Sequence, residues 1–392
     1  MLDYRQKRLR LGLALAICLC LAYTAGFGVY RLREKVIAAR SPGPKDARVF
    51  WEAWRRVEGH FFGDVPSPQA RTYAAIRRSL TLLDPYTVFI EPVSRELEQD
   101  RLRGSYGGIG VDVWRDAQGR FVLAPYPDSP AQRAGLSRGD LLVAIDGQPV
   151  SGSLTESDVK ARLHGEVGTP VRLTVQRARP SDGLNDEIQV EIERQQIDVP
   201  SLVWHLEGAD TGYVHLLRFT ERTGDELSDA LQALSRAGAA NLVLDLRENR
   251  GGLLESSVAV AGQFLNHGDV VLYQEGRSGR RTFRARGEGD VETPLAVLVD
   301  GGTASAAEIV AGALQDNGRA PLIGQPTFGK GSVQEIYHLS DGSSLHVTTA
   351  IWITPDRHRI DKKGLTPDRL VPDSDDGVDQ ALSQALTYLG SE

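Results

Sequence analysis

One stretch of the chain decides the fold: Leu295-Ala296-Val297-Leu298-Val299-Asp300-Gly301-Gly302-Thr303-Ala304-Ser305-Ala306-Ala307-Glu308. Its first part is a short apolar run, which is typical of a strand buried on both faces. A glycine turn follows, and the segment from Ser305 onward has a helical pattern. The stretch therefore predicts a strand, a tight turn and a helix in direct succession.

The same order recurs along the chain from about residue 197. A strand pattern is followed by a helical pattern three times: Gly212–Arg218 with Gly224–Ala237, Asn241–Leu246 with Leu254–Leu265, and Leu295–Asp300 with Ser305–Gln315. Repeated strand–helix units are typical of a sheet of mostly parallel strands with helices packed on it. We therefore expect an α/β core over residues 194–392.

Ser305 is a candidate nucleophile, because it lies at the turn between a strand and a helix. Such a turn lies where the sheet opens to solvent, and the amides of a helix N-terminus favour developing negative charge. A second interpretation is purely structural. Ser305-Ala306-Ala307-Glu308 is also a capping box, with serine at the N-cap and glutamate three residues later. The stretch alone leaves both interpretations open.

Lys330 lies 25 residues after Ser305, in the motif Thr327-Phe328-Gly329-Lys330-Gly331-Ser332-Val333-Gln334. A lysine serves as the base for a serine only if its amine is neutral, so its pKa must fall from about 10.4 by roughly three units, or about 4 kcal/mol. Apolar neighbours, and no Asp or Glu beside it in the chain, favour this. In an extended segment Gln334 lies on the same face as Lys330 and would hold the amine in place without favouring its charged form. The alternative is a surface lysine in a glycine turn.

Residues 104–193 have a different pattern, in which short β-like runs alternate with Gly, Pro and Asp turns. The glycine-rich Gly108-Ile109-Gly110-Val111 is followed by Asp128-Ser129-Pro130-Ala131, Gly139-Asp140 and Ile145-Asp146-Gly147. This series resembles a PDZ domain of the bacterial protease type. The resemblance implies that Gly108, Ile109 and Gly110 hold a peptide C-terminus, because converging amides bind a carboxylate and the next strand offers an edge. The alternative is a β-rich domain with no ligand.

The part before residue 104 is predicted to be a helical region joined to a membrane anchor. Residues 49–103 carry apolar side chains at three- and four-residue steps, and residues 31–48 contain Ser41-Pro42-Gly43-Pro44, which indicates a linker. Residues 11–30 are 20 consecutive uncharged positions after a basic N-terminus, enough to cross a bilayer. We expect residues 1–30 to be a cytoplasmic tail and transmembrane signal anchor in the inner (plasma) membrane, with the catalytic part extracytoplasmic. A cleaved signal peptide is the alternative.

Composition excludes several classes of protein. The 392 residues are 41% hydrophobic and 25% charged, which indicates two or three folded units rather than disorder. A net charge of −7 argues against nucleic-acid binding. The cysteines, Cys18 and Cys20, both lie in the apolar run. Disulfide frameworks, zinc sites and thiol nucleophiles are therefore not expected after it, and we expect no metal and no cofactor.

Nearly everything after the anchor resembles the C-terminal processing peptidases (tail-specific proteases), which use a Ser/Lys dyad. Their motifs occur here in family order: Leu83-Asp84-Pro85-Tyr86, the PDZ-like segment, Asp245-Leu246-Arg247-Glu248-Asn249-Arg250-Gly251-Gly252, the Thr303-Ala304-Ser305 turn and Phe328–Gln334. The resemblance implies a core like that of crotonase and Clp protease, with an inserted PDZ-like domain. One difference is Arg250, where the family commonly has proline.

The resemblance also assigns roles to single residues. Ser305 would be the nucleophile, Lys330 the general base and Gln334 the residue that orients the lysine. The backbone amide of Ala306 and that of Gly251 or Gly252 would form the oxyanion hole.

We therefore predict a membrane-anchored serine endopeptidase that binds the free, apolar C-terminal tails of protein substrates through its PDZ-like domain. Two other functions fit the sequence less well. A non-catalytic tail-binding module on the same scaffold is less favoured, because Ser305, Lys330 and Gln334 are all present. Nucleotide binding at Gly324–Lys330 is disfavoured, because Gly331 stands where a Walker A loop requires Ser or Thr.

Overall fold

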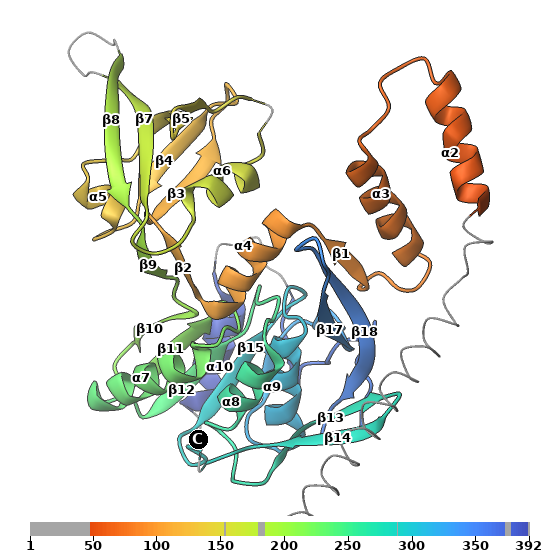
Figure 1. Ribbon diagram of the computed structural model, residues 1–392. Helices are drawn as coiled ribbons and strands as arrows, with labels where there is room; N and C mark the ends of the chain where they lie inside the picture. The colour runs from red at the N-terminus through yellow and green to blue at the C-terminus, as the bar shows by residue number, and fades with distance from the viewer. Residues whose placement is uncertain (1–47, 153, 179–184, 288, 373–377, 391–392) are drawn as a thin grey trace, which may run out of the picture. The chain divides into compact units, whose positions relative to one another are not determined.

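The computed structural model describes residues 48–152, 154–178, 185–287, 289–372 and 378–390 (Figure 1). The predicted anchor at 11–30 and residues 31–47 of the predicted linker lie outside this range. Within the described ranges, every helix is too short or too polar to span a bilayer. The chain divides into two compact units, residues 1–75 and 76–392.

The described part of the first unit is helical. It contains α2 (Arg48–His60) and the first residues of α3 (Pro68–Leu80). The two segments contact each other through Arg71, which forms an ion pair with Glu58 and lies 5.0 Å from the centroid of the Trp54 ring. None of the α2 residues is buried, and Trp51 is 55% exposed.

The main sheet of the second unit has six strands in the order β10-β11-β12-β15-β16-β19. Its strands are β10 (Leu202–Glu207), β11 (Thr211–Leu216), β12 (Asn241–Asp245), β15 (Leu295–Val299), β16 (Leu322–Gly324) and β19 (Arg369–Leu370). Strand β10 is antiparallel to β11, and all other neighbouring pairs are parallel. This arrangement agrees with the mixed α/β core that the repeated strand–helix pattern predicts.

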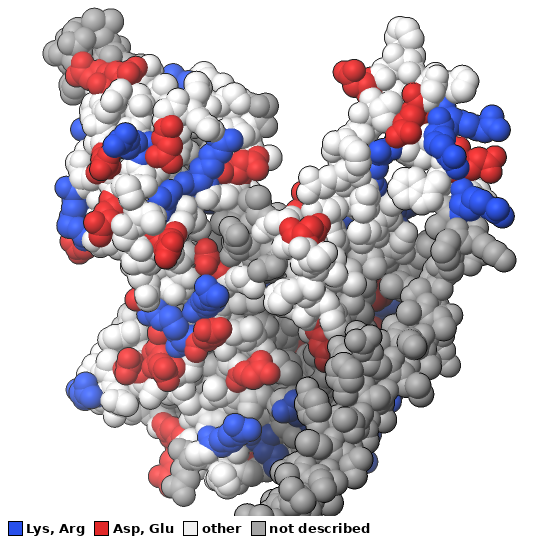
Figure 2. All heavy atoms as spheres, viewed as in Figure 1, with Lys and Arg blue, Asp and Glu red and all other residues white. Residues whose placement is uncertain are grey.

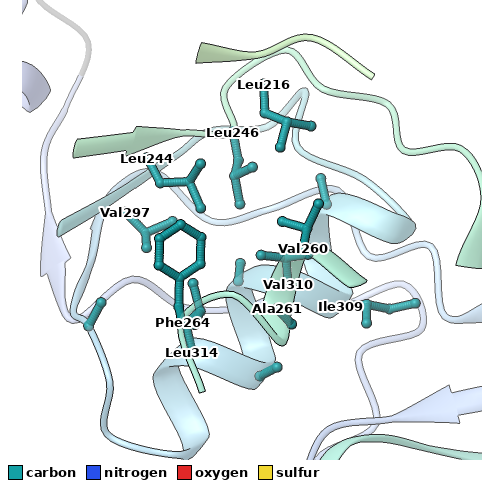
Figure 3. Close-up of a cluster of buried hydrophobic side chains, with 14 of the residues drawn as sticks. Leu216, Leu244, Leu246, Val260, Ala261, Phe264, Val297, Ile309, Val310 and Leu314 are labelled. Carbon is teal, nitrogen blue, oxygen red and sulfur yellow. The ribbon is translucent and has the colours of Figure 1, made fainter. Parts of the chain in front are cut away.

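Helices cover both faces of this sheet: α7 (Thr223–Arg236), α8 (Leu254–Ala261), α9 (Ala306–Asp316) and α10 (Gln380–Leu389). Alternate residues of a strand point to opposite faces. Leu244 and Val297 accordingly pack with α7, α8 and α9, in the core that Figure 3 shows. Val243 and Ala296 pack with α10 on the other face. A sheet buried on both faces needs continuous apolar strands, which the sequence provides.

A second sheet of five strands was not predicted. It contains β1 (Val88–Ile90), β13 (Val270–Gly276), β14 (Gly279–Arg284), β17 (Ser332–His338) and β18 (Ser344–Ile353). All its pairings are antiparallel, and β18 pairs with β1, β13 and β17. Many of its side chains are exposed, so its strands lack the continuous apolar runs that identify the main sheet.

The PDZ-like part folds around its own core. Its strands are β3 (Val111–Arg115), β4 (Phe121–Pro125), β5 (Asp140–Ile145), β6 (Gln148–Pro149), β7 (Pro170–Ala178) and β8 (Asn185–Glu193), with helices α5 (Pro130–Arg133) and α6 (Glu156–Leu163). A capping box of Thr155 and Asp158 begins α6. The strand order is β3-β4-β5-β7-β8, with β6 paired to β5.

A two-stranded antiparallel ribbon flanks the PDZ-like part in the sequence. Its strands are β2 (Ser105–Gly108), which precedes the PDZ-like part, and β9 (Gln195–Asp198), which follows it. Helix α4 (Pro92–Arg103) precedes the ribbon and ends at Gly104, which has φ 76°. On the face drawn in Figure 2, acidic and basic side chains of the described residues are interspersed.

Candidate active site

The candidate site lies where three parallel strands of the main sheet end. Strands β11, β12 and β15 run in the same direction, so their carboxyl ends meet at one edge, the usual place for a site in such sheets. The chain then passes through Phe219, Gly251 and Ser305, respectively. Hydrogen bonds join these loops: the amide of Phe219 donates to the carbonyl of Gly251 at 3.2 Å, and that of Ala304 to the carbonyl of Asn249 at 2.9 Å.

Ser305 has an unusual backbone conformation, with φ 57° and ψ −117° at the N-cap of α9. Non-glycine residues rarely have positive φ, and holding one there costs about 1–3 kcal/mol. Strained turns of this kind, between a strand and a helix, expose the nucleophile in α/β-hydrolases. Ser305 is half-buried.

Lys330 and Gln334 are in contact, but they do not lie on one regular extended strand as the sequence suggests. Lys330 precedes β17, and the register of β17 against β18 shifts between Val333 and Gln334. Such bulges re-aim side chains next to active sites. The Lys330 amine donates a hydrogen bond to Oε1 of Gln334 at 3.4 Å. The Gln334 amide nitrogen donates to the carbonyl of Tyr86.

Glu308 joins the two halves of the site. It is 0% exposed, and its carboxylate accepts four hydrogen bonds. The amide of Ser305 donates at 2.9 Å, the Thr327 hydroxyl at 2.6 Å, the amide of Gly329 at 2.7 Å and the amide of Lys330 at 2.9 Å. The sequence shows no acidic neighbour of Lys330, but the fold brings this carboxylate against its backbone. Glu308 is thus more than the helix cap that the sequence indicates.

One cavity of about 540 Å³ gathers most of the predicted site residues. Its wall includes Gly251, Gly252, Ser305, Ala306, Lys330 and Gln334. Ser305 and Lys330, which sequence analysis pairs, therefore line the same cavity.

The two glycines of the pair have different environments. Gly251 has φ 90°, and a Cβ there would lie 2.8 Å from Cβ of Ser305 and from the amide nitrogen of Ala306. Its own amide donates to Oδ1 of the buried Asn249 at 2.8 Å. Gly252 forms a parallel bridge with Phe219, in which the amides of Phe219 and Leu253 are the donors. The Gly252 amide therefore points away from Phe219.

A second cluster supports the loop that carries the glycine pair. Arg247 forms ion pairs with Asp245 at 2.6 Å and Asp379 at 2.8 Å. The Tyr213 hydroxyl also donates to Asp245, at 2.5 Å. Burial works to lower the pKa of Arg247, but its two carboxylate partners outweigh burial and raise the pKa above its ordinary value. The cluster fixes β12 and the start of the loop to α10.

The cavity carries more positive than negative charge. Its wall has five basic side chains and two acidic ones: Arg101, Arg218, Arg250, Arg281, Lys330, Glu255 and Glu335. Burial, and then the nearby Arg101, lower the pKa of Arg218. Within the described residues, the Arg218 guanidinium has no hydrogen-bond or ion-pair partner. Arg250, the difference from the family pattern, thus adds charge to the cavity wall.

The predicted peptide-binding loop lies between β2 and β3. Gly108 ends β2, and Ile109 and Gly110 are buried. Ile109 and Gly110 line a groove beside α6 that has only about 10 Å³ of free volume. The Tyr106 ring also lines this groove and stacks on the ring of His164, with 4.0 Å between the two ring centroids.

Three residues that touch the site were not predicted as functional: Asn249, Tyr86 and Glu308. Asn249 and Tyr86 lie inside the quoted motifs, and this is the sequence signal that could have identified them. Their contacts to Gly251 and Gln334 depend on the fold.

Comparison with known proteins identifies both parts of the second unit. Residues 210–371 match peptidase family S41, and residues 121–177 match a PDZ domain. The carboxy-terminal-processing protease of Bartonella bacilliformis is 36% identical over 347 residues, which cover 86% of this chain and 78% of that protein. The carboxyl-terminal-processing protease of Synechocystis sp. is 36% identical over 307 residues, covering 76% and 71%.

Among solved structures, this chain is similar to a photosystem II D1 C-terminal processing protease. The two are 32% identical, with a TM-score of 0.49, and the match covers 89% of this chain and 98% of the other.

Proposed function

This chain belongs to peptidase family S41 and is a serine-type endopeptidase with a PDZ domain, and from that premise we propose that Ser305 is its nucleophile and Lys330 its general base. What supports this assignment best is that Ser305, Lys330 and Gln334 line one cavity, with the lysine amine hydrogen-bonded to the Gln334 amide oxygen. Gln334 is the residue that orients the amine.

In the proposed first step, the Ser305 hydroxyl oxygen attacks the carbonyl carbon of a substrate peptide bond. Its proton passes to the neutral amine of Lys330, which becomes an ammonium. The tetrahedral intermediate then collapses as the carbon–nitrogen bond breaks. The Lys330 ammonium returns the proton to the leaving amine, and an acyl-enzyme remains on Ser305.

Hydrolysis of the acyl-enzyme repeats these steps with water as the nucleophile. Lys330 takes a proton from the attacking water and gives it to the Ser305 oxygen as the ester bond breaks. The products are two peptides, and the enzyme returns to its starting state.

We propose that the amides of Ala306 and Gly252 hold the negative oxygen of the tetrahedral intermediate. Ala306 is the first residue of α9, so its amide has no intrahelical acceptor. Of the glycine pair, Gly251 donates its amide to Asn249, whereas Gly252 is exposed and lines the cavity. Gly251 instead provides room, because a side chain there would collide with Ser305.

We propose that residues 104–193 bind the C-terminal tail of a protein substrate and that residues 194–392 hydrolyse it. The loop at Gly108, Ile109 and Gly110 would hold the tail carboxylate, and β3 would pair with the tail as an added strand. The apolar groove residues beside this loop favour apolar tails. The named relatives are carboxy-terminal-processing proteases, which supports the proposal that a C-terminal tail is recognised.

Amidation of the tail is expected to weaken its binding about tenfold or more, because a charge-assisted hydrogen bond is worth about 1.5–3 kcal/mol and 1.4 kcal/mol is tenfold in affinity. The measurement is calorimetry on full-length Ser305→Ala, which keeps the tail intact, with one apolar peptide in free-acid and amide forms. An N-acetylated peptide with a free C-terminus is the control. Equal affinity for the acid and the amide would show that the carboxylate is not recognised.

The charge of the cavity predicts a preference among cleavage sites. Peptides with Glu near the scissile bond should be cut about 3–10-fold faster than otherwise identical peptides with Lys, because an ion pair in a partly buried site is worth about 1 kcal/mol. About 0.5 M salt should reduce the difference. Arg218→Gln and Arg250→Gln should each reduce it as well, measured as kcat/KM. A preference that is unchanged by salt and by both substitutions would rule out these arginines as its cause.

We propose that residues 11–30 anchor the chain in the inner (plasma) membrane, with residues from 31 onward outside the cytoplasm. The length of the uncharged run and the basic residues before it support this topology. Protease added to spheroplasts should degrade the catalytic part, and protease added to intact cells should not. Protection in spheroplasts would contradict the topology.

We also propose that the core belongs with the crotonase and Clp protease folds.

The experiment that tests the proposed function is incubation of the full chain with an unfolded protein that has an apolar C-terminus. Mass spectrometry should find new peptide ends with wild-type protein and none with Ser305→Ala. If the wild type only binds the tail and releases no fragments, the alternative of a non-catalytic tail-binding module on this scaffold replaces the proposal.

A further inference from the structure

A short turn before β1 is built around the carboxylate of Asp84. Its Oδ1 accepts hydrogen bonds from the amides of Tyr86 at 2.7 Å and Thr87 at 2.8 Å, and its Oδ2 accepts one from the Thr87 hydroxyl at 2.7 Å. Burial works to raise the pKa of Asp84, but these hydrogen bonds outweigh burial and lower it. Asp84 is therefore a carboxylate at neutral pH, and it fixes the backbone of residues 84–87.

The turn is also fixed to β18, the central strand of the second sheet. The Thr348 hydroxyl donates to Asp84 at 3.2 Å, and the Thr348 amide donates to the Thr87 hydroxyl at 3.2 Å. In the neighbouring β17, Gln334 is the residue in register with Thr348. The turn is thus held against the strand pair that carries Gln334.

The carbonyl of Tyr86 determines which way the Gln334 amide faces. This carbonyl accepts a hydrogen bond from the Gln334 amide nitrogen. A backbone carbonyl is only an acceptor, so the NH₂ group must face it and the amide oxygen must face the other way. That oxygen accepts the hydrogen bond from the Lys330 amine. The opposite amide orientation would place the carboxamide oxygen against the Tyr86 carbonyl, and two acceptors cannot share a hydrogen bond.

The side chain of Tyr86 also contacts the base. The Lys330 amine lies 5.5 Å from the centroid of the Tyr86 ring. A cation within about 6 Å of an aromatic face is attracted to it, so the ring favours the ammonium form of the amine. Burial raises the pKa of the Tyr86 hydroxyl, as do the carboxylates of Asp361, Glu308 and Asp84. The ring therefore stays neutral while the amine gains and loses its proton.

We propose that residues 84–87 position the general base of this enzyme: Asp84 holds the Tyr86 carbonyl in place, the carbonyl orients Gln334, and Gln334 orients the Lys330 amine. This role rests on the proposed Ser305/Lys330 dyad and extends it to a segment that precedes Ser305 by about 220 residues in the sequence. Asp84 is a positioning residue, because in this arrangement it acts on Lys330 only through Tyr86 and Gln334. The Tyr86 ring has a second effect, on the proton affinity of the amine.

The test compares full-length Asp84→Ala with Asp290→Ala. Asp290 is a matched control, because its carboxylate also accepts two amide hydrogen bonds in a turn, from Glu292 at 3.2 Å and Thr293 at 3.0 Å, and it does not line the cavity. Asp84→Ala should lower kcat about 30-fold with KM nearly unchanged. This is below the roughly 10²-fold cost of a 1 Å displacement, because the Thr348 amide still donates to the Thr87 hydroxyl. Asp290→Ala should keep kcat within about twofold of the wild type by the same argument.

Variants with smaller changes separate positioning from folding. Asp84→Asn keeps one carboxamide oxygen for the two amides and should recover most of kcat. Tyr86→Leu keeps the carbonyl but removes the ring, so the acidic limb of the pH–rate profile should move to lower pH by about half a unit. Tyr86→Phe keeps both ring and carbonyl, and its profile should match the wild type. The pH–rate profiles of the two Tyr86 variants test the inference even if Asp84→Ala fails to fold.

The inference is overturned if Asp84→Ala and Asp290→Ala show the same loss of Tm and both retain wild-type kcat, or if Tyr86→Leu leaves the pH profile unchanged. Neither result would affect the proposed function, which is tested separately. If Ser305→Ala still cleaved the substrate, the dyad itself would be wrong, whatever the Asp84 variants do.

Discussion

Lys330→Arg is expected to lower kcat/KM for peptide cleavage by about 10⁴-fold or more, the usual effect of losing a member of a catalytic dyad or triad. Arginine is a basic side chain of similar reach, but it does not lose its proton in proteins and so cannot accept one from Ser305. Lys330→Ala should be equally inactive. The measurement is the initial rate on a fluorogenic peptide, with Tm and tail affinity expected to match the wild type.

The double variant provides a sharper test of the dyad. Residues that act as one unit are strongly non-additive, so Ser305→Ala combined with Lys330→Ala should be no slower than either single variant. If the two losses multiply, Ser305 and Lys330 act in separate steps and the dyad mechanism is wrong.

Restoring the amine chemically tests whether Lys330 acts as a base. Lys330→Cys treated with 2-bromoethylamine carries an amine at nearly the original position, and it should recover activity. The sulfur in the new side chain withdraws electrons and lowers the pKa of the amine, so the recovered activity should extend to lower pH than in the wild type. Treated wild-type protein is the control, because Cys18 and Cys20 also react. No recovery in an alkylated, folded protein would count against the base role.

Much of the main sheet could be predicted because burial on both faces imposes a strong pattern. Strands such as Leu295–Val299 are apolar without interruption, and the following helix begins at Ala306, one residue after the expected start. The second sheet gave no such signal. Strand β17 exposes residues on both faces after Gln334, so neither continuous hydrophobicity nor strict alternation marks it.

The sequence identifies candidate site residues but not the contacts between them. Ser305 and Lys330 stand in recognisable motifs, but Glu308, which connects their backbones, was visible only as a helix cap. Three of its four hydrogen bonds come from residues 327–330, and chain order does not reveal that this loop returns to the start of α9. The same limit applies to Tyr86, which contacts Gln334 at a separation of 248 residues.

Glu308→Gln is expected to lower kcat about 10²-fold and also to destabilise the core. A carboxamide has one acceptor oxygen and one donor NH₂, so about two of the four donors that face Glu308 would lose their partner. Buried unpaired amides cost about 1–3 kcal/mol each, so a loss of about 3 kcal/mol of unfolding free energy is expected. That loss lowers Tm by about 6–12 °C in a domain of this size.

The loss of activity should exceed what the loss of stability explains, because Glu308 binds the amides of both Ser305 and Lys330. If their separation changes by about 1 Å, kcat falls about 10²-fold even in fully folded protein. Asp140→Asn is the matched control: Asp140 is 1% exposed and bonds the amide of Ser137 and Arg177, within the PDZ-like part. It should lower Tm but spare the cleavage of a short peptide. Equal kcat in Glu308→Gln and wild type, well below both melting temperatures, would show that Glu308 only stabilises the fold.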